Sequence, residues 1–174
     1  MSESAELIYP VNGKIVSVKV GNNNESVEII KSVLDNFPVK LVLDLHNVTD
    51  LFNSTENISP LQKCVLSFVG KSSDTRTAAR EDIKQRIIDG QVSFGILVFK
   101  RSNRHKVGQK SWILSLFDES QQMIFIDDSD DHIVAVNDAN LNNVTAYWLN
   151  VDIDENNSQW KNKMKTKLVE YLST

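Results

Sequence analysis

LVLDLHNV, residues 41–48, places the aspartate Asp44 at the end of a short apolar run. Runs of this kind are typical of the buried strands of a parallel sheet. In an open α/β sheet, ligands bind beyond the carboxyl ends of the strands, and an unpaired carboxylate is costly to bury there. We therefore expect Asp44 to face a metal ion, another cation or a reacting group.

A second run of the same kind is MIFIDD, residues 123–128, which ends in Asp127 and Asp128. Because the carboxyl ends of parallel strands meet at one edge of a sheet, two such runs can bring three carboxylates together. Carboxylate oxygens are ligands that Mg²⁺ prefers, whereas His46, His105 and His132 do not form a transition-metal spacing. The sequence therefore predicts magnesium chemistry at this edge.

Apolar runs alternate with helical patterns along the rest of the chain. The expected strands are Lys14–Val20, 39–43, 61–68, Phe94–Phe99, 123–126 and 144–149. The expected helices are 24–37, Ser73–Ile88, 109–117 and 158–172. This alternation predicts an α/β fold with a doubly wound, mostly parallel sheet and helices on both faces.

The chain has 174 residues, 41% of them hydrophobic, which suits one domain with a full core. We expect a single domain over 1–174, with a core at 39–149 and an amino-terminal strand and helix at 1–37. The formal net charge of −4 argues against a general nucleic-acid-binding face. The strongest basic run, 100–110, is either a solvated loop or a funnel for an anionic substrate.

A single cysteine, Cys64, rules out an intrachain disulfide and favours a reducing compartment. No apolar run approaches the ~20 residues that span a bilayer. We therefore expect no membrane association and a location in the cytoplasm, or in the host cytoplasm for a viral protein. The three tryptophans, Trp112, Trp148 and Trp160, are expected to pack in the core or against helices.

The order of four sites resembles that of the haloacid dehalogenase-like (HAD) phosphohydrolase superfamily. Asp44 lies at one strand end, Ser67 at the next, Lys110 at a helix start, and Asp127 with Asp128 at a later strand end. The resemblance covers roughly residues 39–149. Phosphoryl transfer needs in-line positioning and positive charge near the equatorial oxygens, which a lysine, a magnesium ion and a hydroxyl donor supply.

The resemblance implies a role for each residue. Asp44 would attack phosphorus and become a phosphoaspartate, and Ser67 would hydrogen-bond the transferred phosphoryl group. Lys110 would neutralise charge between nucleophile and phosphate. Asp128 and Asp127 would hold Mg²⁺ directly or through water, together with Asp44.

The chain departs from the family's pattern at His46, because the family usually has a second aspartate two residues after the nucleophile. In the family this residue offers its backbone carbonyl to the metal, a role that any side chain preserves. In the family's phosphatases the aspartate side chain at this position protonates the leaving oxygen and then activates water. The imidazole of His46 can do both near pH 7. The expected function is a magnesium-dependent phosphatase, active or weakened. The alternative is an inactive HAD-like binding or scaffold protein.

Too few residues separate Asp44 from the next expected strand to form a large cap domain. By resemblance, capless members have open sites that favour large phosphorylated substrates such as phosphoproteins or nucleic-acid ends. A third interpretation is a receiver-like phosphoacceptor, which also groups acids, a hydroxyl and a lysine. In such proteins the acid pair precedes the phosphoacceptor strand, whereas here the pair Asp127 and Asp128 comes late in the chain, which argues against this interpretation. The oligomeric state is left open.

Overall fold

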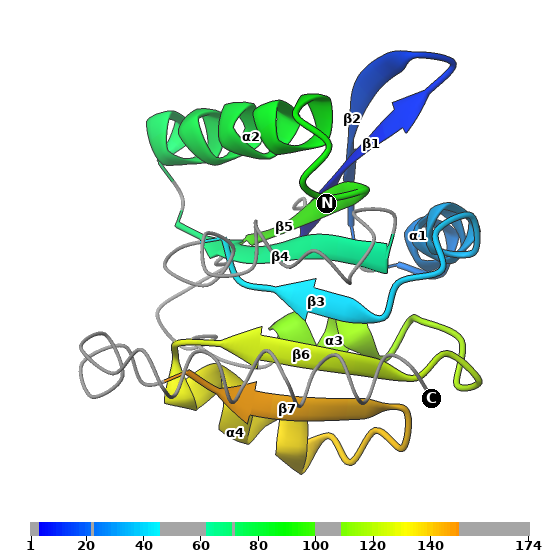
Figure 1. The fold of residues 1–174 in the computed structure, drawn as a ribbon, viewed down its shortest axis with the longest axis vertical. Coiled ribbons are helices and arrows are strands. Elements are labelled where there is room, and N and C mark those ends of the chain that lie inside the picture. Colours follow the sequence, from blue (N-terminus) through cyan, green and yellow to red (C-terminus); the bar gives the residue numbers. More distant parts are fainter. Residues whose placement is uncertain (1–3, 22, 46–61, 71, 100–108, 150–174) are drawn as a thin grey trace.

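The computed structural model describes residues 4–21, 23–45, 62–70, 72–99 and 109–149, which form one seven-stranded sheet and four helices (Figure 1). The strands are β1 Ala5–Val11, β2 Lys14–Val20, β3 Leu41–Leu43, β4 Lys63–Val69, β5 Phe94–Phe99, β6 Met123–Asp127 and β7 Val144–Trp148. The helices are α1 Asn24–Leu34, α2 Ser73–Ile88, α3 Gln109–Leu114 and α4 Asp130–Asp138. The expected α/β class with a mostly parallel sheet is confirmed.

The strand order is β2-β1-β5-β4-β3-β6-β7, and the five strands from β5 to β7 run parallel. This order is compatible with a Rossmann-like fold, because the chain moves from β3 to β4 and β5 on one side and then returns to place β6 on the other. The order therefore reverses between β3 and β6. Their carboxyl ends point to the same edge of the sheet, at the left in Figure 1.

A hairpin of β1 and β2 extends the sheet antiparallel to β5. Its two-residue turn is Asn12-Gly13, with φ of 51° and 81°, the positive values that a type I′ turn requires. The prediction for β2 is confirmed, but β1 was not expected. Pro10 and the charged Glu6 interrupt the apolar pattern of β1, so the sequence signal for this hairpin is the Asn12-Gly13 pair at its turn.

Two hydrophobic clusters lie on opposite faces of the sheet, as alternate residues of β4 show. Cys64 and Leu66 belong to the first cluster, whereas Val65 and Val69 belong to the second. The first cluster receives buried side chains from α1, α3 and α4: Ile30, Val33, Leu34, Ile113, Leu114, Ile133 and Val136. The second receives Ala79 and Ile83 from α2. We call the face of the sheet that carries the first cluster the α3 face, and the face that carries the second cluster the α2 face.

The remaining helix predictions have mixed outcomes. The helices at 24–37 and Ser73–Ile88 are confirmed, with Asn23 and Ser72 as their N-caps, and the one at 109–117 is confirmed but shorter. Helix α4 was not predicted as an element, and the helix expected at 158–172 lies outside the described residues.

Within the described ranges, no helix combines the length and apolar character needed to cross a membrane. The division into a core and an amino-terminal extension stays a prediction.

Candidate functional site

Asp44 and Asp127 lie at the point where the strand order reverses. The backbone N–H of Asp44 donates to the carbonyl of Ile126 at 3.1 Å, which continues the pairing of β3 with β6 for one residue beyond Leu43. Asp127 is the last residue of β6, and Asp128 follows it. Ligands of open α/β sheets bind at this kind of position.

Lys110 joins the two carboxylates from the first turn of α3. Its Nζ lies 2.9 Å from Asp44 Oδ1 and 2.5 Å from Asp127 Oδ2. All three residues are buried, with relative exposures of 7% for Asp44, 1% for Asp127 and 2% for Lys110. Charged groups this deeply buried need close partners, because desolvation would otherwise keep them neutral. The lysine is therefore the counter-charge that allows two carboxylates to share this place.

Backbone contacts fix the acidic end of β6. Asp127 Oδ1 accepts a hydrogen bond from the Ser129 N–H at 2.9 Å, and the Asp127 carbonyl accepts one from Leu149 N–H at 2.9 Å. The indole Nε1–H of Trp148 donates to the Asp128 carbonyl at 3.1 Å. Both aspartates are thus held in place by their neighbours on β7 and at the start of α4.

Burial raises the pKa of Asp44 to about 6. The positive charge of Lys110 opposes this rise, whereas the negative charges of Asp127 and Asp128 add to it. Asp44 is therefore mainly ionised at neutral pH, but by a small margin. A further positive charge at the site would favour the ionised form.

Asp44, Asp127 and Asp128 could hold a divalent cation. One carboxylate oxygen from each lies within 4.8 Å of the others. With all three ionised, Lys110 balances one of the three negative charges, so a formal charge of −2 remains. Oxygen donors and this charge fit a hard divalent ion such as Mg²⁺.

The structure separates Ser67 from this cluster. Ser67 lies on β4 between Leu66 and Phe68, and strand alternation directs its side chain to the α2 face with Val65 and Val69. Lys110 approaches the carboxylates from the opposite face. Ser67 Oγ is fully buried and has no hydrogen-bond partner among the described residues.

His46 and most of the basic run lie outside the described residues, because His46 falls in the gap at 46–61 and the basic run overlaps the gap at 100–108. The roles assigned to His46, as acid/base and as a backbone ligand, therefore stay predictions. So does the funnel hypothesis for the basic run.

His132 lies beside the carboxylate cluster and was not among the expected site residues. Its Nδ1 lies 3.8 Å from Asp127 Oδ2, and its ring meets the edge of Phe68 with centroids 5.4 Å apart. Burial lowers the pKa of His132, and the charge of Lys110 lowers it further. A neutral imidazole therefore lies beside the buried acids. Recognition of α4 in the sequence would have placed His132 in its first turn, near Asp127 and Asp128.

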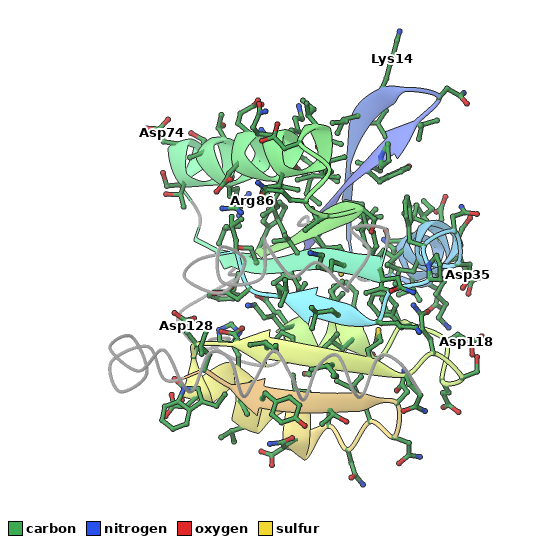
Figure 2. The ribbon with its side chains drawn as sticks, in the orientation of Figure 1. Lys14, Asp35, Asp74, Arg86, Asp118 and Asp128 are labelled. Carbon is green, nitrogen blue, oxygen red and sulfur yellow. The ribbon has the colours of Figure 1, made fainter. Side chains whose placement is uncertain are left out.

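A hollow of about 390 Å³ lies away from the carboxylates. It is lined by Lys31 of α1, by Asp35, which caps the carboxyl end of that helix, and by residues 115–119, which precede β6. Figure 2 shows Asp35 and Asp118 at one end of the sheet and Asp128 at the other. The lining mixes one lysine with three acids and holds none of the predicted site residues, so we assign the chemistry to the carboxylate cluster.

Comparison with protein-family models, curated proteins and solved structures found no match to this chain.

Proposed function

We propose that the protein is a HAD-like, magnesium-dependent phosphohydrolase with Asp44 as its nucleophile. The observation that carries the proposal is the sharing of one buried ammonium, that of Lys110, by Asp44 and Asp127 at the reversal point of the sheet. The proposal includes a doubly wound sheet without a large cap domain. It rests on the motif order in the sequence together with this geometry.

In the proposed reaction, Asp44 attacks phosphorus through a carboxylate oxygen. The bond from phosphorus to the ester oxygen breaks, and Asp44 becomes a phosphoaspartate. A pKa of about 6 keeps the nucleophile ionised at pH 7. Lys110, within hydrogen-bond distance of Asp44, offsets the negative charge on the transferred group.

The leaving oxygen needs a proton, and the second step needs a base. We assign both tasks to His46, which gives its proton to the leaving oxygen and then takes one from the attacking water. Water attacks phosphorus, inorganic phosphate leaves, and the Asp44 carboxylate is restored. Ser67 has no part in this scheme, because its side chain is directed to the α2 face.

Asp44, Asp127 and Asp128 would hold Mg²⁺, together with the His46 backbone carbonyl. Bound Mg²⁺ would reduce the repulsion between the carboxylate nucleophile and the phosphate. The residual formal charge of −2 supports this assignment. We further propose a cytoplasmic enzyme with an open site that admits macromolecular phosphate esters, since few residues separate Asp44 from β4.

The alternative function is an inactive HAD-like binding or scaffold protein. The observation that favours it is His46, which stands where the family's phosphatases have an acid. A protein with this change could keep an anion or metal site and lack turnover.

Turnover of a generic aryl phosphate with Mg²⁺ tests the proposal in three proteins: the wild type, Asp44→Asn and His46→Asp. We expect wild-type activity that Asp44→Asn abolishes. A silent wild type with an active His46→Asp variant would support the scaffold alternative. Activity that survives Asp44→Asn would contradict the nucleophile assignment.

A further inference from the structure

Trp148 is a large exposed aromatic residue beside the carboxylate cluster. It is the last residue of β7 and pairs in register with Asp127. Val144 and Ala146, which alternate with it along β7, pack against the α3 face, and so does Phe125, two residues before Asp127. Strand alternation therefore directs Trp148 and Asp127 to the same face, on neighbouring strands.

Trp148 was expected to pack in the core or against helices; it does not lie in the core, because the residue is 48% exposed. Its Nε1–H already donates to the Asp128 carbonyl. The hydrogen bond satisfies the polar group of the indole and ties the ring to a residue of the cluster. An aromatic ring that is fixed and still exposed can stack against another ring without first being ordered.

Exposed apolar residues that occur singly are ordinary, so exposure alone does not indicate a binding role for Trp148. Its position beside the carboxylate cluster distinguishes it from the others. The other large exposed hydrophobic residues in the described ranges are Val11, Ile29, Ile88 and Val134. None of these has an aromatic ring. None is paired in register with a residue that contacts Lys110.

We propose that Trp148 binds a planar aromatic ring in the group esterified to the phosphate. This inference rests on the proposed function, because it needs the phosphate to lie at Asp44. It names the substrate class as monoesters whose alcohol carries an aromatic ring. A nucleobase and a carbocyclic ring share this stacking chemistry.

Three esters with similar alkoxide leaving groups test the inference: benzyl phosphate, a nucleoside 5′-monophosphate and butyl phosphate. We expect the wild type to show a KM about tenfold lower for a ring-bearing ester than for butyl phosphate. Trp148→Ala should abolish this preference and Trp148→Phe should retain most of it. Val134→Ala, another exposed apolar position, serves as the control and should keep it. The nucleotide and benzyl arms identify which ring is preferred.

A wild type without any ring preference, or a preference that survives Trp148→Ala, would overturn the inference and leave the proposed function standing if Asp44→Asn is inactive. Equal loss of the preference in Trp148→Phe and Trp148→Ala would attribute the effect to the hydrogen bond to Asp128 and would also overturn it. If no ester is turned over, calorimetric binding of benzylphosphonate and butylphosphonate decides. Tighter binding of the benzyl compound that depends on Trp148 supports the inference, and equal or absent binding refutes it.

Discussion

Asp44 and Asp127, which end adjacent parallel strands, are bridged by the Lys110 ammonium at 2.9 and 2.5 Å. This bridge brings together three residues that lie far apart in the sequence. It also leaves the site with more negative than positive charge, because Asp128 lies in the same cluster. A site of this kind costs stability in the metal-free protein, because buried carboxylates repel one another.

Asp44→Asn should stabilise the metal-free protein at pH 7.5. The folded pKa of Asp44 is about 6 against an ordinary value of 3.8, so between these values the folded state binds more protons and stability falls as the pH rises. A pKa rise of this size lowers the free energy of unfolding by roughly 3 kcal/mol once Asp44 is ionised. Urea unfolding in EDTA should show a gain of up to about 3 kcal/mol at pH 7.5 that disappears near pH 4. Asp35→Asn, at an exposed position, should show no such pH-dependent gain.

Lys110→Met should be strongly destabilising at pH 7.5, because it leaves two buried carboxylates without their shared counter-charge. Removal of one partner from a buried ion pair costs about 3–5 kcal/mol. Lys31→Met, at an exposed position on α1, should change stability by less than about 0.5 kcal/mol. Urea unfolding checks both variants. A loss below about 1 kcal/mol for Lys110→Met would mean that the ammonium is not the main charge partner of the carboxylates.

Mg²⁺ should raise the melting temperature of the wild type beyond the effect of NaCl at equal ionic strength. A ligand that binds only the folded state stabilises it, by about 2.7 kcal/mol at one hundred times its Kd. Asp128→Asn should weaken this response, whereas Asp35→Asn, at the opposite end of the sheet (Figure 2), should preserve it. The same response in both variants would place the bound ion elsewhere.

Arg80→Met tests a second ion pair, which joins the partly exposed Arg80 of α2 to the buried Glu6 of β1. Glu6 is fully buried and accepts hydrogen bonds from Arg80, one of them at 2.8 Å from Nη2 to Oε1. Burial by itself raises the pKa of Glu6, but hydrogen bonds from Arg80 and Ser17 and the positive charges of Arg80 and Lys19 together lower it below its ordinary value. The pair therefore adds stability above the ordinary value of 4.5 and loses it as the pH falls through the lowered pKa.

Urea unfolding at pH 7 should show a loss of about 3 kcal/mol for Arg80→Met. The control is Lys84→Met, which removes a more exposed partner of Glu81 and should cost less than about 1 kcal/mol. Acid titration of stability should then show the difference between wild type and Arg80→Met shrinking as Glu6 becomes protonated. An equal cost for both substitutions would contradict the assigned burial of Glu6.

The acidic strand ends could be predicted from sequence because their signal is local. An apolar run followed by an acid identifies Asp44 and Asp127 without knowledge of the sheet order. The order itself, which puts β3 beside β6, depends on crossovers between distant segments. Sequence patterns therefore predicted which carboxylates to consider, and the fold explains why Asp44 and Asp127 meet.

The place of three other residues was not predicted from the sequence. His132 lies in a short helix, α4, that begins with two aspartates and was not among the expected helices. Trp148 is exposed because it lies at the end of β7, an outer strand of the sheet. The apolar residues around it in the sequence instead suggest a buried position. Ser67 met the spacing expected of a phosphate ligand, but strand parity directs it to the other face. These outcomes depend on tertiary packing.

Chemical trapping of the phosphorylated residue tests the central claim most directly. The protein would be incubated with Mg²⁺ and a phosphate ester, quenched, reduced with borohydride and mapped by mass spectrometry. Borohydride converts a phosphoaspartate to homoserine, so the proposed mechanism predicts homoserine at position 44 in the wild type and none in Asp44→Asn. Phosphate ester turnover without modification at Asp44, or modification at a different residue, would contradict it.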